Sequence, residues 1–158
     1  MGLAALATPV GHGDADRVNF VKGGVYSADK LDGAGCGRLL EQASLGRVVL
    51  SVGCLPAAVP VHVNVARGHV LLGCPPGPVL DAAQRGDVVS VEFDGEELDG
   101  ATWSVLVTGV ARVVAADDPL NDVVRRDRLA RTIERGAVLV AVPLTYVTGE
   151  RTAWSTSS

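Results

Sequence analysis

The sequence has few aromatic side chains and no apolar run long enough to cross a membrane. Aromatic residues make up only 4% of the 158 residues, while 47% are hydrophobic and most of these are valine, leucine or alanine. A membrane-spanning helix needs about 18–20 consecutive apolar residues, and the N-terminus lacks the basic and apolar segments of a secretory signal. We therefore expect a cytoplasmic protein with no membrane partner.

Positive charge and cysteine are also scarce. The 14 lysines and arginines are outnumbered by 18 acidic residues, so the net charge is -4, which argues against a nucleic-acid partner. Cys36, Cys54 and Cys74 are odd in number and far apart. This spacing predicts reduced thiols and fits no zinc motif, so no metal site is predicted.

The sequence does contain short apolar stretches separated by turn residues. The clearest is 57–65, where valines alternate with Pro60, His62 and Asn64. Valine-rich segments favour strands, and a bend or bulge is expected at Gly109, inside the longest of them. We predict six strands, at residues 47–52, 57–65, 69–73, 88–93, 102–114 and 137–147.

Three helices are expected between the strands. The first lies within 31–43 after a Ser27 cap, and the second covers 79–85. The third begins at Asp118 with Pro119 and ends at Gly136, and its Asp–Arg spacings (122 with 126, 127 with 131) suit surface ion pairs. These elements predict a mainly β fold, a six-stranded antiparallel barrel.

We expect the barrel domain to span 25–151, between a mobile arm at 1–24 and a tail at 152–158. Exposed strand edges require closure or dimerisation.

Four segments resemble the pyridoxamine 5'-phosphate oxidase-like split barrels common in actinobacteria. They are LGRVVLS at 45–51, LPAAVPVHV at 55–63, WSVLVTGVARVV at 103–114 and VAVPLTYVTGER at 140–151. The resemblance implies a homodimer that holds FMN, or sometimes another flavin or haem, at the subunit interface. It also implies a flavin-dependent oxidoreductase that acts on a small molecule.

The loop that grips the flavin phosphate in such relatives is altered. The family loop typically reads Arg-Thr-Gly-Pro-Gly-Ser-Lys-Leu, whereas residues 73–80 read GCPPGPVL. Gly73, Cys74, Pro78 and Val79 therefore replace the arginine, threonine, serine and lysine. Each charge-assisted hydrogen bond contributes about 1.5–3 kcal/mol, so losing three would weaken binding by ~4 kcal/mol or more, roughly a thousandfold. Tight FMN binding is expected to be lost unless Arg47 or Arg85 compensates.

The resemblance also implies the site residues. His62 and Ser104 are candidate catalytic groups, although His62 equally fits a plain exposed strand face and Trp103 equally fits core or dimer packing. Strand alternation places Trp103 and Ser104 on opposite faces, so one pocket should not hold both without a bulge. The candidate cofactor-binding residues are Pro60, Asn64, Cys74, Gly77, Val79, Trp103 and Arg151.

Three functions remain open from the sequence. The first is a flavin-dependent oxidoreductase. The second is a flavin-free enzyme of specialised metabolism, such as a cyclase or isomerase, that uses an emptied apolar pocket. The third is a non-catalytic small-molecule binder or interaction module.

Overall fold

The computed structural model describes residues 19–21, 24–125 and 128–155. Its helices are α1 (Gly33–Gln42), α2 (Pro78–Arg85), α3 (Leu120–Val124) and α4 (Arg128–Glu134). Its strands are β1 (Asn19–Val21), β2 (Gly24–Lys30), β3 (Leu45–Val52), β4 (Leu55–Ala66), β5 (His69–Cys74), β6 (Val88–Glu96), β7 (Thr102–Val110), β8 (Arg112–Val113), β9 (Val138–Pro143) and β10 (Tyr146–Ser155). The mainly β prediction is confirmed.

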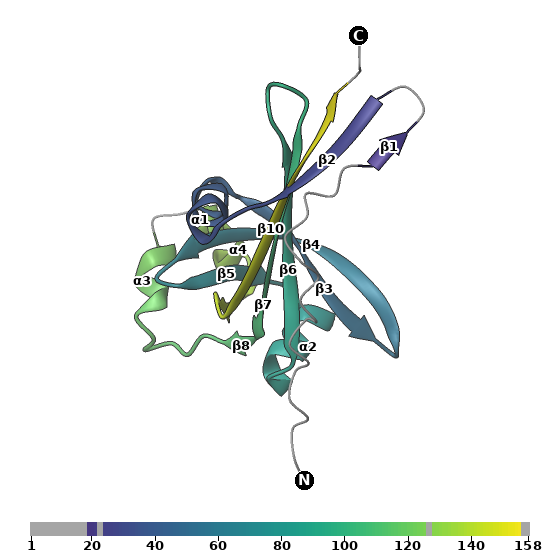
Figure 1. Cartoon of the computed structure of the whole chain (residues 1–158). Coiled ribbons are helices and arrows are strands. Elements are labelled where there is room, and N and C mark those ends of the chain that lie inside the picture. Colours follow the sequence, from purple (N-terminus) through teal and green to yellow (C-terminus); the bar gives the residue numbers. More distant parts are fainter. Residues whose placement is uncertain (1–18, 22–23, 126–127, 156–158) are drawn as a thin grey trace.

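The strands pair antiparallel in the order β1-β2-β10-β7-β6-β3-β4-β5-β9-β8. Because β8 continues β7 after a single residue, the row from β7 to β8 begins and ends on one stretch of chain and curls into a barrel (Figure 1). The barrel strands β3, β4, β5, β6 and β7–β8 correspond to the first five predicted segments. The sixth, 137–147, is β9 followed by the start of β10, with a break after Pro143. Beyond them, β1, β2 and the end of β10 form an arm with the β6–β7 turn.

The main core fills the barrel. Val48, Val91 and Val107 are fully buried at alternating positions of their strands, Val140 is fully buried on β9, and Phe93 supplies the largest side chain. Burying such a side chain contributes roughly 1.5–3 kcal/mol relative to leaving it in water. Helices α1 and α2 add residues to the same core, including Cys36, Leu40, Val79, Leu80, Ala82 and Ala83.

A second core lies on the outside of the sheet, beneath α3 and α4. Leu71 of β5 and Leu139 of β9 form this cluster with Leu120, Val124 and Leu129 from the two helices. Helices α3 and α4 therefore cover the outer face of β5 and β9. Among the described residues, no helix is long and apolar enough to span a membrane.

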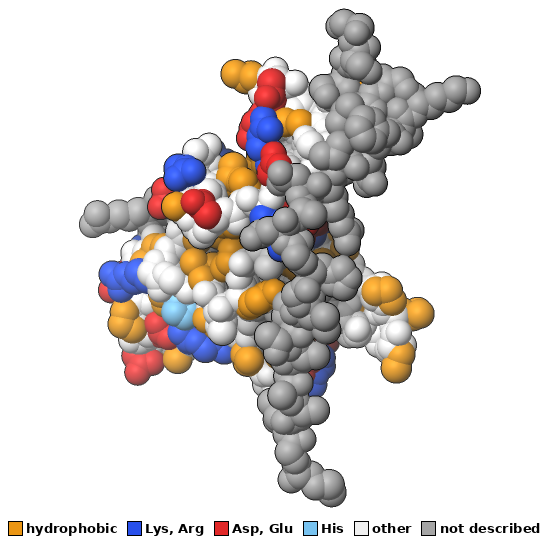
Figure 2. Space-filling view, in the orientation of Figure 1, with side chains coloured by type: hydrophobic (Ala, Val, Ile, Leu, Met, Phe, Trp, Pro, Cys, Tyr) orange, Lys and Arg blue, Asp and Glu red, His pale blue; other side chains and the backbone are white. Residues whose placement is uncertain are grey.

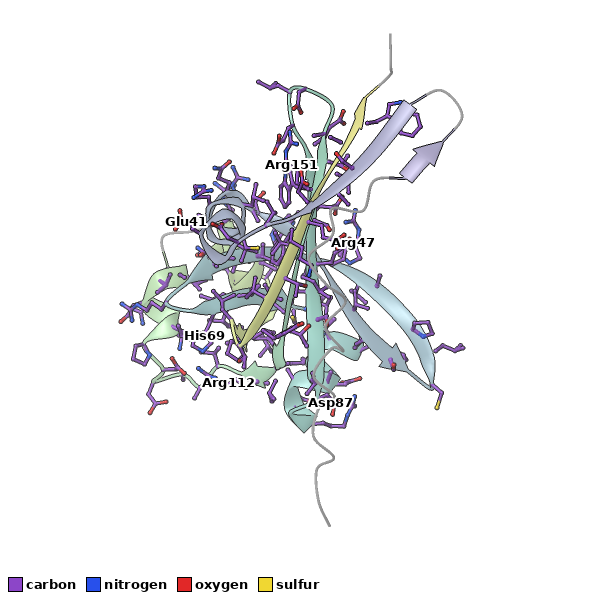
Figure 3. All side chains as sticks on the ribbon, in the orientation of Figure 1. Glu41, Arg47, His69, Asp87, Arg112 and Arg151 are labelled. Atoms are coloured by element: carbon purple, nitrogen blue, oxygen red, sulfur yellow. The ribbon has the colours of Figure 1, made fainter. Side chains whose placement is uncertain are left out.

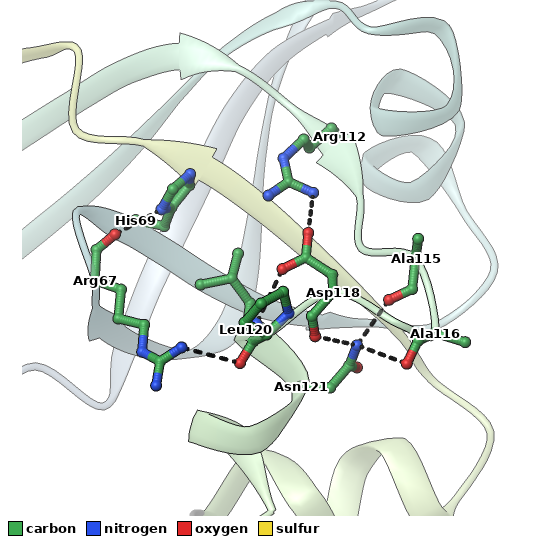
Figure 4. A network of polar contacts seen from close by, with 9 residues as sticks. Arg67, His69, Arg112, Ala115, Ala116, Asp118, Leu120 and Asn121 are labelled. Atoms are coloured by element: carbon green, nitrogen blue, oxygen red, sulfur yellow. Dashed lines mark hydrogen bonds and ion pairs between the residues drawn. The ribbon is translucent and has the colours of Figure 1, made fainter.

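The predicted third helix is two helices in the structure. At 100° per residue, Leu120 and Leu129 would fall on opposite faces of one continuous helix. Ending α3 at Val124 and starting α4 at Arg128 lets both leucines pack on the sheet. At the start of α3, Asp118 accepts a hydrogen bond from the Leu120 N–H at 2.9 Å and pairs with Arg112 (Figure 4). The expected partners Arg126 and Asp127 lie outside the described residues.

Two other expectations are corrected. Ser27 lies in β2, and the α1 cap is Asp32, whose side chain accepts from the Gly35 N–H at 2.6 Å. At Gly109 the longest strand makes no bulge. It breaks two residues later, and a Cβ at Gly109 would lie 2.7 Å from the Pro143 carbonyl oxygen.

The expected arm and tail also differ. The arm at 1–24 lies largely outside the described residues, but Asn19–Val21 pairs with β2. Much of the expected tail continues β10 as far as Ser155, paired with β2.

Candidate functional site

The end of β5 lies directly against helix α4. A Cβ atom built on Gly73 would lie 3.0 Å from Cγ2 and 3.2 Å from Cβ of Thr132. Real Cβ atoms rarely come so close, so α4 occupies the space that a side chain at position 73 would need. The resemblance places the family's arginine at position 73, where a side chain would require Thr132 of α4 to shift.

Two other altered loop positions point into the protein. Cys74 and Val79 are 0% and 4% exposed and belong to the main core. Burial raises the pKa of the Cys74 thiol to about 12, so it stays protonated near neutral pH. Gly77 lies just before α2, and the exposed Pro78 is its first residue and has no N–H to donate. The loop side chains thus offer an anion no accessible donor.

A different group of side chains lines a cavity of about 790 Å³ beside the same strands. His62 contributes from the outer face of β4, and Leu45, its register partner on β3, lies beside it with Ser44. The opposite wall comes from α4 and the residue that follows it. The lining residues are Ser44, Leu45, His62, Arg128, Arg131, Thr132 and Arg135.

The helical repeat explains why three arginines share this wall. Arg131 and Arg135 follow Arg128 by three and seven residues, so they lie on one face of α4. Leu129 lies on the other side and packs in the second core. None of the described lining residues is acidic, and no carboxylate within the described ranges forms an ion pair with Arg131 or Arg135.

The arginines considered from sequence as replacement phosphate ligands are engaged elsewhere. Arg47 pairs across the sheet with Asp94 and Glu92, and Arg85 pairs with Asp87 at 2.7 Å. Figure 3 shows Arg47 and Asp87 well separated on the ribbon. Neither arginine lines the α4 cavity.

Arg151 lies on the arm and binds two carboxylates. Its guanidinium donates to Glu97 at 2.7 and 2.9 Å and to Asp99 at 2.8 Å (Figure 3). The hydrogen bond to Glu97 is the main reason that the pKa of Arg151 is raised. The pKa of Asp99 is lowered, chiefly by the Ala101 N–H and also by Arg151. This arginine is part of an ion-pair cluster at the β6–β7 turn.

Trp103 and Ser104 line a second hollow of about 530 Å³ on the arm. The indole lies against Gly95, where a Cβ would be 2.6 Å from Cζ2 of Trp103. Gly95 is opposite Trp103 in the β6–β7 register, and its missing side chain leaves room for the indole. Trp103 and Ser104 border one hollow, contrary to the expectation from alternation. This hollow on the arm shares no lining residue with the cavity beside α4.

Pro60 and Asn64 share the outer face of β4 with His62 but do not line the α4 cavity. The described residues contain no cluster of three or more histidine, cysteine or acidic side chains suited to a metal. The structure thus brings His62 together with arginines that were interpreted from sequence only as helix-surface ion-pair partners or left unassigned. Their i, i+3, i+7 spacing was the available signal.

Comparison with known proteins gives consistent matches. The family described as pyridoxamine 5'-phosphate oxidase matches residues 32–151. The uncharacterised protein Rv0080 of Mycobacterium tuberculosis is 37% identical over 122 residues, covering 72% of this chain and 78% of that protein.

Two solved structures share the fold. The FAD-binding protein of Mycobacterium smegmatis is 28% identical, with a TM-score of 0.56, covering 78% of this chain and 97% of that one. An FAD-binding protein from Mesorhizobium loti has a TM-score of 0.70 at 18% identity, covering 80% and 97%. The chain belongs to the pyridoxamine 5'-phosphate oxidase family.

Proposed function

We propose that this protein is a homodimeric split barrel that binds a flavin nucleotide and uses it in redox chemistry on a small molecule. The observation that carries the proposal is the α4 cavity. Its volume of about 790 Å³ lies within the range of small-molecule and cofactor sites. Its arginines fit an anionic ligand, as a flavin phosphate would require. Family membership and the FAD-binding proteins of the same fold support the choice of a flavin.

The outer face of the sheet supports the homodimer. Val49, Ser90, Thr108 and Tyr146 form one cross-strand row over β3, β6, β7 and β10. Val49 and Tyr146 are 38% and 49% exposed, and the neighbouring Val88–Val110 pair is also exposed. The β3–β4 hairpin extends from the barrel with apolar side chains at its tip, among them Val52 and Leu55 (Figure 2). A second copy would remove this apolar surface from water.

In such a dimer, each flavin would contact residues of both copies. The α4 arginines would hold the anionic end of the ligand, and Pro60, His62 and Asn64 would border its ring system on β4. Trp103 and Ser104, which border a separate hollow in one chain, would cover the ring from the second copy. When bound, the flavin would supply the electron or hydride transfer. His62 would exchange a proton with the substrate.

The test is a titration of the purified protein with riboflavin, FMN and FAD, followed by flavin fluorescence and visible absorbance. We expect binding that quenches the fluorescence and shifts the flavin spectrum. His62→Ala should retain the flavin but lose turnover of a substrate found by screening. A protein that remains colourless and leaves all three flavins unchanged would refute the proposal.

A flavin-free role is favoured by one observation, the loss of every phosphate ligand from the loop at 73–79. In that case the same cavity would take a small organic anion instead. The predicted apolar ligand is a poorer match, because three of the seven lining residues are arginines. Failure to bind flavin would favour this second candidate.

A further inference from the structure

We infer that the phosphate-binding site of this protein lies on helix α4. Arg131, Arg135 and Arg128 bind the phosphoryl group of the ligand in place of the β5–α2 loop. The inference rests on the proposed function only for the identity of that ligand as a flavin nucleotide. The cavity and its charge are features of this chain alone.

The first argument is steric. Thr132 lies so close to Gly73 that a Cβ there would be 3.0 Å from its Cγ2 atom. A side chain at position 73 would press on Thr132, so an arginine there would require Thr132 or helix α4 to shift. The contact between Gly73 and Thr132 disfavours an arginine on β5. It also holds α4 where its arginines line the adjoining cavity. Loss of the loop ligand and gain of the helix ligands are thus linked in one packing arrangement.

The second argument is electrostatic. Arg131 and Arg135 line one cavity, and no described carboxylate forms an ion pair with either, although acidic residues outnumber basic ones in the chain, 18 to 14. Like charges three or four residues apart destabilise a helix. The helix dipole favours a cation at Arg135, next to the C-terminal end, but disfavours one at Arg128, the first residue of α4. A bound anion would offset the repulsion between Arg131 and Arg135.

The third argument is the match between donors and ligand. Three guanidinium groups in one cavity lining supply enough donors for more than one phosphoryl group. Guanidinium groups bind phosphate through paired hydrogen bonds. The hydroxyls of Ser44 and Thr132 are further donors in the same lining. The site suits an extended anion such as a diphosphate.

The test uses inorganic pyrophosphate and calorimetry on the full chain. We expect the unaltered protein to bind pyrophosphate and the double variant Arg131→Ala/Arg135→Ala to bind it at least tenfold more weakly. The matched control Arg85→Ala/Arg125→Ala removes the same charge from ion pairs outside the cavity and should change the affinity less than twofold. Arg131→Lys/Arg135→Lys keeps the charge and should give an intermediate loss, provided that circular dichroism shows all variants folded.

Riboflavin, which has no phosphate, separates the two proposals. We expect it to bind the unaltered protein and the double alanine variant equally, while FMN loses its advantage over riboflavin in the variant. Pyrophosphate binding that needs Arg131 and Arg135, without any riboflavin binding, would support the anion site and refute the flavin. Riboflavin binding together with pyrophosphate binding that is absent, or unaffected by the double substitution, would overturn the anion site alone.

Discussion

A Cβ atom placed on Gly73 would lie 3.0 Å from Cγ2 of Thr132, so strand β5 and helix α4 meet in a contact too tight for a side chain unless Thr132 shifts. This contact connects the fold to the site. It joins the strand that leads into the altered loop to the helix that supplies the cavity arginines. Substitutions at either residue should therefore affect both stability and ligand binding.

Replacing Gly73 with alanine should destabilise the protein. Extra volume in a well-packed contact typically costs about 1–3 kcal/mol, and urea unfolding would measure the change. Thr132→Ala removes the nearer of the two contacting atoms, so Gly73→Ala should cost less in that background. Equal costs in both backgrounds would show that the two residues do not press on each other.

The three thiols should differ sharply in reactivity. Cys54 is exposed at the β3–β4 turn, whereas Cys36 and Cys74 are buried. Burial raises the pKa of both buried thiols, that of Cys74 to about 12, so little thiolate is available to react. Iodoacetamide labelling at pH 8, followed by mass spectrometry, should modify Cys54 first. Labelling of Cys74 at the same rate would contradict its placement in the core.

Burial of Cys74 also predicts how stability depends on pH. The unfolded thiol has a pKa near 9.0 and the folded thiol a pKa of about 12, so the folded state retains the proton to higher pH. The contribution is complete below pH 9 and is lost as pH rises from about 9 to 12. Cys74→Ala should therefore flatten the fall in melting temperature above pH 9, in comparison with Cys54→Ala as the control.

Arg151→Met should leave ligand binding unchanged. The Arg151 guanidinium is held by Glu97 and Asp99 on the arm and does not line the α4 cavity. Exposed ion pairs contribute little to stability, so only a small decrease in the urea midpoint is expected. A lost preference for FMN over riboflavin in this variant would instead place Arg151 among the phosphate ligands.

Val49→Glu should disrupt the proposed homodimer. It would place a charge in the centre of the outer sheet face, where a second copy would have to bury it at high cost. Light scattering during size-exclusion chromatography should report half the mass of the unaltered protein. Leu98→Glu, on the exposed β6–β7 turn, is the matched control and should keep the dimer mass. A monomeric unaltered protein would refute the homodimer.

The sequence predicted the barrel because its strands follow a local rule. Val59, Val61 and Val63 alternate with polar or exposed residues, and glycine or proline marks the turns, so each strand can be identified from its own residues. Pairings far apart along the chain leave no such pattern. The pairing of β2 with β10, for example, joins Ala28 to Thr152. Neither residue was predicted to lie in a strand, so their pairing was not predicted.

The site was predicted only in part, for a related reason. His62 follows from the alternation in β4, but its neighbours on α4 depend on how a distant helix packs against Gly73. Arg131 was interpreted as the partner of an aspartate four residues earlier. Arg131 lines the cavity with Arg128 and Arg135 because α4 starts separately from α3. Helix periodicity could have grouped the three arginines but could not have placed them beside His62.

The central claim is that the phosphate-binding site lies on α4. A crystal structure of the protein, from crystals soaked in pyrophosphate, tests it most directly. We predict density for the phosphoryl groups within hydrogen-bond distance of Arg131 and Arg135. Phosphoryl density at the N-terminus of α2, beside Pro78 and Val79, with the α4 cavity empty, would contradict the account.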